Sequence, residues 1–304
     1  MSDNDLVRVQ EQLYLQQMMG VNKAAIRDLM PMWCRNVGEN MDIARHAKSL
    51  GDMPRGEGSC IVVASAPSLT DEDILKLREF KGDIITVNKN FKRFIDLDIL
   101  PKWVVLLDAH PVSMGQFRFV REYVWKEKPN FFVSTVVHPQ TVRLLQEFAG
   151  EQFYMTNPVE LSNEVIMECP KCKHLFEHTT TIRISTAWEW MNGLPEFPHG
   201  GNVGTCAFLL ARELDYSRIG MMGFDFYEKP NPEMSVHEAL GIEHLYYPGF
   251  GTIAWPAHMK AYFSYMAGVL QDTAAEVRYL GNSPLFTNCP LVESESVEDF
   301  LEGK

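Results

Sequence analysis

Short apolar runs alternate with helical segments along most of the chain, and this alternation limits the possible folds more than any other feature. Each run is bounded by turn residues, which is typical of strands buried on both faces. The runs lie at 60–64, 83–88, 103–108, 130–135, 152–156, 218–223 and 276–280. Thr70 and Asp73, a hydroxyl and a carboxylate three positions apart, predict a capped helix after the first run. Strands that alternate with helices form parallel sheets, so we predict an α/β, doubly wound fold with a mostly parallel sheet.

Breaks in the alternation predict the domain organisation. A Gly- and Pro-rich stretch at 51–58 separates an expected N-terminal helical extension, residues 1–57, from an expected nucleotide-binding α/β domain at 58–290. Residues 157–199 contain four prolines and are predicted to be an insertion or lid within that domain. Residues 291–304 are expected to be a C-terminal tail. The apolar helices of the N-terminal extension suggest a homodimer.

Composition and charge exclude several classes of protein. The formal net charge is −12, and no basic face is apparent that would grip the phosphates of a duplex, so we expect no nucleic-acid partner. The chain starts without a basic and apolar leader, and no apolar run reaches the ~18 residues of a membrane span. The six cysteines are dispersed. We therefore expect a soluble, cytoplasmic protein with reduced thiols.

Two turns have the features of anion sites. Ser65, Ala66 and Ser68 lie between the first strand and its helix, where backbone N–H groups and the helix start attract negative charge. Gly201 and Asn202 precede the helix expected at 203–214 and offer a second site of the same kind. Neither turn is a Walker loop or a dinucleotide fingerprint, and each is also compatible with an ordinary turn.

Polar residues also follow the other predicted strands. Asn88 and Asp108 end two of them, and Asp225 and Tyr227 follow the run at 218–223. In an open parallel sheet ligands bind beyond the carboxyl ends of the strands, so these side chains would meet at one edge. Strand ends are polar in most proteins, but the whole set predicts a phosphate or nucleotide site.

Several segments resemble a known family. They are Ile61–Leu69, Thr86–Asn90, and Gly200–Ala211 followed by Ile219–Tyr227. They are similar to the MptE-like 6-hydroxymethylpterin pyrophosphokinases, which include the motility accessory factors, and equally to the bacterial CMP-sialic acid sialyltransferases that share their fold. The resemblance covers roughly residues 30–290 and implies a Rossmann-like, sialyltransferase-like domain that uses a small-molecule nucleotide substrate. Trp33, Asn36 and Asn40 also resemble the helix that precedes the motility-factor core.

The sialyltransferase resemblance implies roles for individual residues. The turn at 65–68 would line the nucleotide phosphate and ribose, and Asn88 would contact the nucleotide or the sugar. Tyr227 would assist the leaving phosphate, and His258 would be the general base. Considered without the resemblance, His258 is better explained as a surface histidine at a helix start.

Two departures from the family pattern keep other functions open. The usual turn contains two glycines, and here both are alanines, Ala64 and Ala66, whose Cβ atoms could crowd a phosphate. Asp108 stands where sialyltransferases tend to have asparagine, and a carboxylate beside a phosphate suits Mg²⁺.

The function expected from the resemblance is a transferase that moves a sugar from a CMP donor. One alternative is Mg²⁺-dependent pyrophosphoryl transfer from ATP to a pterin-like alcohol, with Asp108 and Asp225 as metal ligands. The other is a non-catalytic nucleotide-binding or interaction module.

A second metal is suggested inside the predicted insertion. Cys169 and Cys172 form a CxxC pair in a proline-containing loop, which resembles half of a zinc knuckle. The other half would be His174 and His178, at a shorter separation than usual. We expect either a structural Zn²⁺ that braces the insertion or free thiols.

Overall fold

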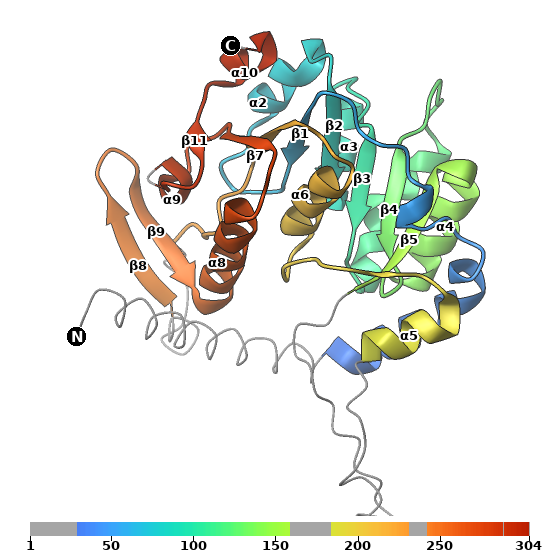
Figure 1. Cartoon of the computed structure of the whole chain (residues 1–304). Helices are drawn as coiled ribbons and strands as arrows, with labels where there is room; N and C mark the ends of the chain where they lie inside the picture. Colours follow the sequence, from blue (N-terminus) through green and yellow to red (C-terminus); the bar gives the residue numbers. More distant parts are fainter. Residues whose placement is uncertain (1–28, 159–183, 231–241, 288, 304) are drawn as a thin grey trace, which may run out of the picture.

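The computed structural model describes residues 29–158, 184–230, 242–287 and 289–303 (Figure 1). Its strands are β1 Ser59–Val63, β2 Asp83–Val87, β3 Trp103–Leu106, β4 Asn130–Ser134, β5 Phe153–Pro158, β6 Glu196–Phe197, β7 Arg218–Met222, β8 Ile242–Tyr247, β9 Gly251–Pro256, β10 Glu276–Tyr279 and β11 Glu293–Ser294. Nine of them form one sheet in the order β11-β10-β7-β1-β2-β3-β4-β5-β6, and every neighbouring pair is parallel. The remaining two, β8 and β9, form an antiparallel hairpin.

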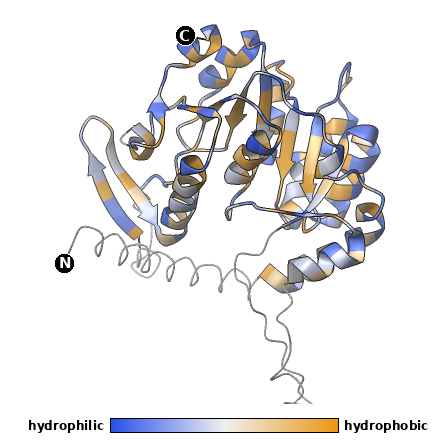
Figure 2. Cartoon of the chain, viewed as in Figure 1, coloured by the Kyte–Doolittle hydropathy of each residue, from blue (hydrophilic) through white to orange (hydrophobic). Residues whose placement is uncertain are grey.

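Helices cover both faces of the sheet. They are a helix at 29–44, α2 Asp71–Lys76, α3 Asn88–Asp96, α4 Pro139–Ala149, α5 Ile184–Asn192, α6 Val203–Glu213, α8 Ala257–Gln271, α9 Pro284–Thr287 and α10 Val297–Glu302. Alternate residues of β1 face opposite sides: Cys60 and Val62 belong to the core that includes α6, whereas Ile61 and Val63 pack with α2 and α3. This explains why the strand is apolar throughout, and Figure 2 shows apolar residues concentrated along the central strands. No helix in the described part is long and apolar enough to cross a membrane.

The chain adds strands first on one side of β1 and later on its other side, beginning with β7. From β1 the chain adds strands outward through β2, β3, β4, β5 and β6, and β7 then pairs with the other edge of β1. The loops that leave the carboxyl ends of β1 and β7 therefore diverge. Such a topological switch point opens a crevice where ligands bind in folds of this type.

The fold and the main strands agree with the sequence-based expectation. The sheet is parallel and doubly wound, and each of the seven predicted strands is present, with ends that differ from the prediction by no more than two residues. The capped helix is confirmed as well: the Thr70 hydroxyl accepts a hydrogen bond from the Asp73 N–H at 3.2 Å, and the Asp73 carboxylate accepts from the Thr70 N–H at 3.0 Å.

Other parts of the chain differ from the expected organisation. The β8–β9 hairpin was not predicted, and the described helix of the expected N-terminal extension ends at residue 44. Within the predicted insertion, the described residues 184–199 supply α5 and the edge strand β6. The expected C-terminal tail contains β11, which pairs with β10, and α10, whose Phe300 is buried. Cys169, Cys172, His174 and His178, the predicted zinc ligands, lie outside the described residues.

Candidate functional site

Two adjoining cavities lie at the carboxyl edge of the sheet. The first, of about 210 Å³, opens at the switch point, and we call it the β1–β7 cavity. The second, of about 270 Å³, lies over the ends of β2 and β3, and we call it the β2–β3 cavity. Both are lined by Lys89, Asn202 and Val203, so they meet at these residues. A larger hollow of about 720 Å³ lies at the opposite, amino edge and contains none of the predicted site residues.

Most of the predicted site residues line one of the two cavities. The β1–β7 cavity is lined by Ser65, Ala66, Asn202, Asp225 and Tyr227. The β2–β3 cavity is lined by Asn88, Asp108, Gly201 and Asn202. Ser68 and His258 line neither cavity, and both lie beside residues that do. The parallel sheet therefore brings these residues to one edge, as expected, and their role in a functional site stays a prediction.

The turn after β1 is held from three sides. The Ala64 N–H donates to the Met222 carbonyl at 2.8 Å, and the Ala64 carbonyl accepts from the Asn90 side-chain amide at 2.9 Å. Gly223 lies directly against the turn, since a Cβ at that position would overlap the Ala64 carbonyl oxygen. A Cβ on Gly204 of α6 would lie 2.9 Å from the Ala64 Cβ. The methyl group of Ala64 is thus accommodated by a glycine on the helix.

Ser68, Asp225 and Tyr227 form one polar group, in which Asp225 and Tyr227 are buried and Ser68 is half-buried. Asp225 accepts hydrogen bonds from the Ser68 N–H at 2.9 Å and the Ser68 hydroxyl at 2.6 Å, and Tyr227 is a further hydrogen-bond partner. Burial raises the pKa of Asp225, although the bonds from Ser68 oppose this shift. Burial, followed by the nearby Asp225 carboxylate, raises the pKa of Tyr227. Tyr227 therefore presents a protonated hydroxyl beside the cavity.

The start of α6 separates the two cavities. Gly200 and Gly201 have φ of +59° and +80°, values that favour glycine, and a Cβ on Gly201 would overlap the Tyr262 ring of α8. The Asn202 side chain caps the helix by accepting from the Thr205 N–H at 2.9 Å. Because Asn202 satisfies the Thr205 N–H, the N–H groups of Val203 and Gly204 are the ones in the first helical turn that are left to attract an anion.

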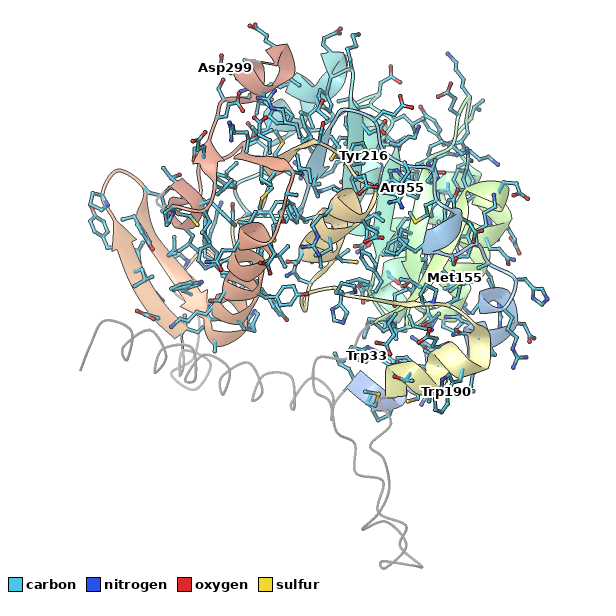
Figure 3. All side chains as sticks on the ribbon, in the orientation of Figure 1. Trp33, Arg55, Met155, Trp190, Tyr216 and Asp299 are labelled. Atoms are coloured by element: carbon cyan, nitrogen blue, oxygen red, sulfur yellow. The ribbon has the colours of Figure 1, made fainter. Side chains whose placement is uncertain are left out.

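The helix at 29–44 forms one wall of the β2–β3 cavity through Trp33. The Asn36 amide donates to the carbonyls of Ala109 at 3.0 Å and Val136 at 2.8 Å, and Asn40 makes two similar bonds to Thr135 and Val137. These bonds fix the helix to the loops that follow β3 and β4. Figure 3 labels Trp33 on this helix. No local sequence pattern indicated that this helix would reach the site.

Asn88 and Asp108 form the polar side of the β2–β3 cavity. The Asn88 amide donates to the Gln116 side chain at 2.7 Å, and one Asp108 oxygen accepts from the His110 N–H at 2.9 Å. Asp108 lines this cavity, whereas Asp225 lines the β1–β7 cavity, so the structure does not bring these two expected Mg²⁺ ligands together. Within the described residues, no group of three or more His, Cys, Asp or Glu side chains could hold a metal ion.

Lys89 supplies a positive charge where the cavities meet. Its side chain is exposed and lines both cavities, and none of the described carboxylates forms an ion pair with it. The residue was not singled out as a site residue, although its place between Asn88 and Asn90 at the end of a predicted strand was a usable signal. An unpaired cation beside a helix start suits a phosphate group.

His258 lies at the rim of the β1–β7 cavity, in the first turn of α8. Its ring contacts the Tyr262 ring edge to face, with centroids 5.8 Å apart, and Tyr262 lines the cavity. Its Nε2 atom lies 3.7 Å from a Glu228 carboxylate oxygen. The backbone of Glu228 exchanges two 2.9 Å hydrogen bonds with Ala254 of β9. The unpredicted hairpin therefore positions both members of the His258–Glu228 pair.

Comparison with known proteins agrees with this fold. None of the curated proteins matches the chain. Among solved structures, a Maf glycosyltransferase from Magnetospirillum magneticum AMB-1 is similar, with a TM-score of 0.52 and 14% sequence identity over 87% of this chain. The alignment spans 40% of that protein, and at this identity the likeness establishes the fold alone. The family model described as 6-hydroxymethylpterin diphosphokinase MptE-like matches residues 32–231, about two thirds of the sequence. The chain therefore belongs to the MptE-like family.

Proposed function

We propose that this protein is a nucleotide-dependent transferase that moves a sugar from a CMP-activated donor to an acceptor hydroxyl. The observation that carries the proposal is the β1–β7 cavity, which is lined by Lys89, the start of α6 and Tyr227 and has His258 at its rim. Membership of the MptE-like family and the fold likeness to a protein named as a glycosyltransferase support a transferase.

In this proposal each residue has a chemical task. His258 takes the proton of the acceptor hydroxyl, whose oxygen forms a bond to the sugar carbon while the bond from that carbon to the phosphate oxygen breaks. The electron pair of the broken bond stays on the phosphate, and CMP departs. The Tyr227 hydroxyl keeps its proton because its pKa is raised, and it turns from Asp225 to donate a hydrogen bond to the departing phosphate. Glu228, 3.7 Å from His258, attracts the imidazolium that forms.

One observation favours the alternative reaction, pyrophosphoryl transfer from ATP. Asp108 lines the β2–β3 cavity together with Lys89, and only one of its two oxygens is shown accepting a bond from the His110 N–H. Mg²⁺ is commonly held by a single carboxylate and the substrate phosphates, and when bound it would neutralise phosphate charge. Asp108 would then bind the metal, and Lys89 would bind a phosphate oxygen.

Thermal unfolding with a ligand panel separates these reactions. The panel is CMP, CDP, CTP, ATP, and ATP with Mg²⁺. A ligand at 100 times its dissociation constant adds ~2.7 kcal/mol to the free energy of unfolding. Stabilisation by cytidine nucleotides without metal is expected, whereas stabilisation by ATP with Mg²⁺ alone would select the alternative. If no nucleotide stabilises the protein, both reactions are rejected in favour of a non-catalytic module.

Variants then test the catalytic assignment. His258→Ala should abolish release of CMP from a CMP-activated nonulosonic acid while CMP binding persists, because His258 acts on the acceptor proton. His46→Ala, at an exposed histidine near the end of the helix at 29–44, is the matched control and should retain activity. Full CMP release by His258→Ala would contradict the role of His258 as the general base.

A further inference from the structure

We propose that the β2–β3 cavity holds the nucleobase of the donor, stacked on Trp33 of the amino-terminal helix, and that this helix thereby sets the base specificity of the enzyme. The inference rests on the proposed function. It goes further by assigning a binding role to Trp33, a residue of the segment expected to be an extension outside the nucleotide-binding domain.

The order of chemical groups along the two cavities supports this assignment. A CMP-activated sugar has its base at one end, the phosphate in the middle and the sugar at the other end. The cavities present an aromatic wall at Trp33, then the cation Lys89 where they meet, and then Tyr227 with His258 at the rim. With the base against Trp33 and the phosphate at Lys89, the sugar extends toward Tyr227. The reverse orientation would place the reacting sugar away from His258.

The cavity also has the chemistry that a base requires. Trp33 offers a π-face, and Leu107, Val136 and Val203 supply apolar walls for a planar ring. Asp108 provides an acceptor for the amino group on the edge of cytosine, as carboxylates do for that group in other complexes. Uracil has a carbonyl oxygen at the same place, which the carboxylate would repel. We therefore expect the cavity to prefer CMP to UMP.

Trp33 is fixed well enough to act as a stacking surface. The bonds from Asn36 and Asn40 join its helix to four backbone carbonyls of the core. On the other side, Val37 and Met41 pack against Trp188 of α5, and the two helices lie side by side in Figure 1. A ring held in place loses little conformational freedom when a base binds, so more of the stacking contributes to affinity.

The test is CMP binding by calorimetry to the full-length chain and three variants. Trp33→Leu keeps apolar bulk but removes the π-face, and should weaken CMP binding about 5- to 150-fold, the range that stacking of one base implies. Trp33→Phe keeps a π-face and should bind nearly as well as the wild type. Trp190→Leu is the matched control, because Trp190 is 71% exposed on α5, as labelled in Figure 3, and should bind unchanged. The free energy of unfolding without ligand checks that each variant is folded.

The outcomes separate this inference from the proposed function. If the wild type binds CMP and Trp33→Leu binds it equally well, the base is not on Trp33, and the proposed function survives. If Trp33→Phe loses as much affinity as Trp33→Leu, the π-face is not the reason and stacking is rejected. If the wild type binds UMP as tightly as CMP, Asp108 does not select the base. If the wild type binds no nucleotide, the proposed function fails first.

Discussion

Ser68 donates two hydrogen bonds to Asp225 across the switch point of the sheet, one from its N–H at 2.9 Å and one from its hydroxyl at 2.6 Å. The two residues belong to the loops that follow β1 and β7, so the bonds tie together the two sides of the β1–β7 cavity. The predicted role of Ser68 was to contact phosphate or ribose. That role stays a prediction; in the structure the Ser68 N–H and hydroxyl are bonded to Asp225, which in turn hydrogen-bonds Tyr227.

The buried Asp225 carboxyl should give stability a specific pH dependence. Burial raises its pKa in the folded state above the value of about 3.9 in the unfolded chain. The folded state therefore holds the proton more tightly, and the stabilisation from this group is complete below the unfolded pKa and lost as pH rises through the folded pKa. The Asp225→Asn variant has no carboxyl group at this position, so its stability does not show this pH dependence. The free energy of unfolding of the wild type minus that of Asp225→Asn should thus decrease between pH 4 and pH 8.

Urea unfolding of both proteins across this pH range gives the comparison. The control is Asp272→Asn, which removes an exposed carboxylate and shows the effect of losing one negative charge without losing a buried group. A difference that stays level, or that increases with pH, would show that Asp225 is not held in a raised-pKa environment.

Gly223 should tolerate no side chain, because of its contact with Ala64. Its φ is +71°, and the φ of Gly58 is a similar +67°, so an alanine at either position meets the ~1–2 kcal/mol cost of a left-handed backbone. A Cβ at Gly223 would also overlap the Ala64 carbonyl oxygen, whereas nothing lies within 4 Å of a Cβ at Gly58. Gly223→Ala should therefore lower the free energy of unfolding more than Gly58→Ala, and it alone should weaken CMP binding.

Chemical denaturation and CMP calorimetry on the two variants measure these effects. Equal losses of stability would mean that the backbone conformation alone explains both. Unchanged CMP binding by Gly223→Ala would mean that the turn after β1 is not part of the nucleotide site.

The sequence predicted the central strands well because each is a buried run with clear boundaries. The Cys60–Ala64 run is apolar throughout since both of its faces are covered, and the Thr70–Asp73 capping box is a purely local signal. The two-residue strands β6 and β11 are too short to produce a pattern. The β8–β9 hairpin was not predicted because β8 is only partly buried, so its sequence lacks a clear apolar pattern.

The site was predictable where it depends on strand ends, and not where it depends on distant contacts. Asp108 and Tyr227 follow strands, and a parallel sheet brings such positions to one edge. Trp33 reaches the cavity because its helix is fixed by long-range bonds, such as the one from Asn36 to the Ala109 carbonyl, 73 positions away. The Ser68 hydroxyl donates its hydrogen bond to Asp225, which lies 157 positions away in the sequence. Neither relationship leaves a trace in the local sequence.

Tyr216 and Asp83 form a hydrogen bond that should stabilise the fold without affecting the site. The Tyr216 ring is buried, and its hydroxyl donates to the Asp83 carboxylate at the amino end of β2, the edge opposite the cavities. Tyr216→Phe removes this bond and should lower the free energy of unfolding by about 1.5–3 kcal/mol, the usual range for a hydrogen bond to a charged group. CMP affinity should be unchanged. Tyr246→Phe, at a tyrosine 73% exposed on the hairpin, should alter neither property.

The pairing of Ala64 with Gly204 should be measurable as a double-mutant cycle. Gly204→Ala would place its Cβ 2.9 Å from that of Ala64, and crowding of this kind costs about 1–3 kcal/mol. Ala64→Gly removes the obstructing methyl group, so Gly204→Ala should cost less in that background. The coupling energy between the two positions, from urea unfolding of the four proteins, should favour the double variant by about 0.5–3 kcal/mol.

Ala66 provides the control for this cycle. It belongs to the same turn but is not among the nearest neighbours of a Cβ at Gly204, so Ala66→Gly and Gly204→Ala should have additive effects. The same variants test whether Ala64, one of the two alanines that replace the usual glycines, crowds the phosphate. If the Ala64 methyl group faces α6, Ala64→Gly should leave CMP affinity unchanged. Tighter CMP binding by Ala64→Gly, together with no coupling to Gly204, would mean that the methyl group crowds the phosphate instead.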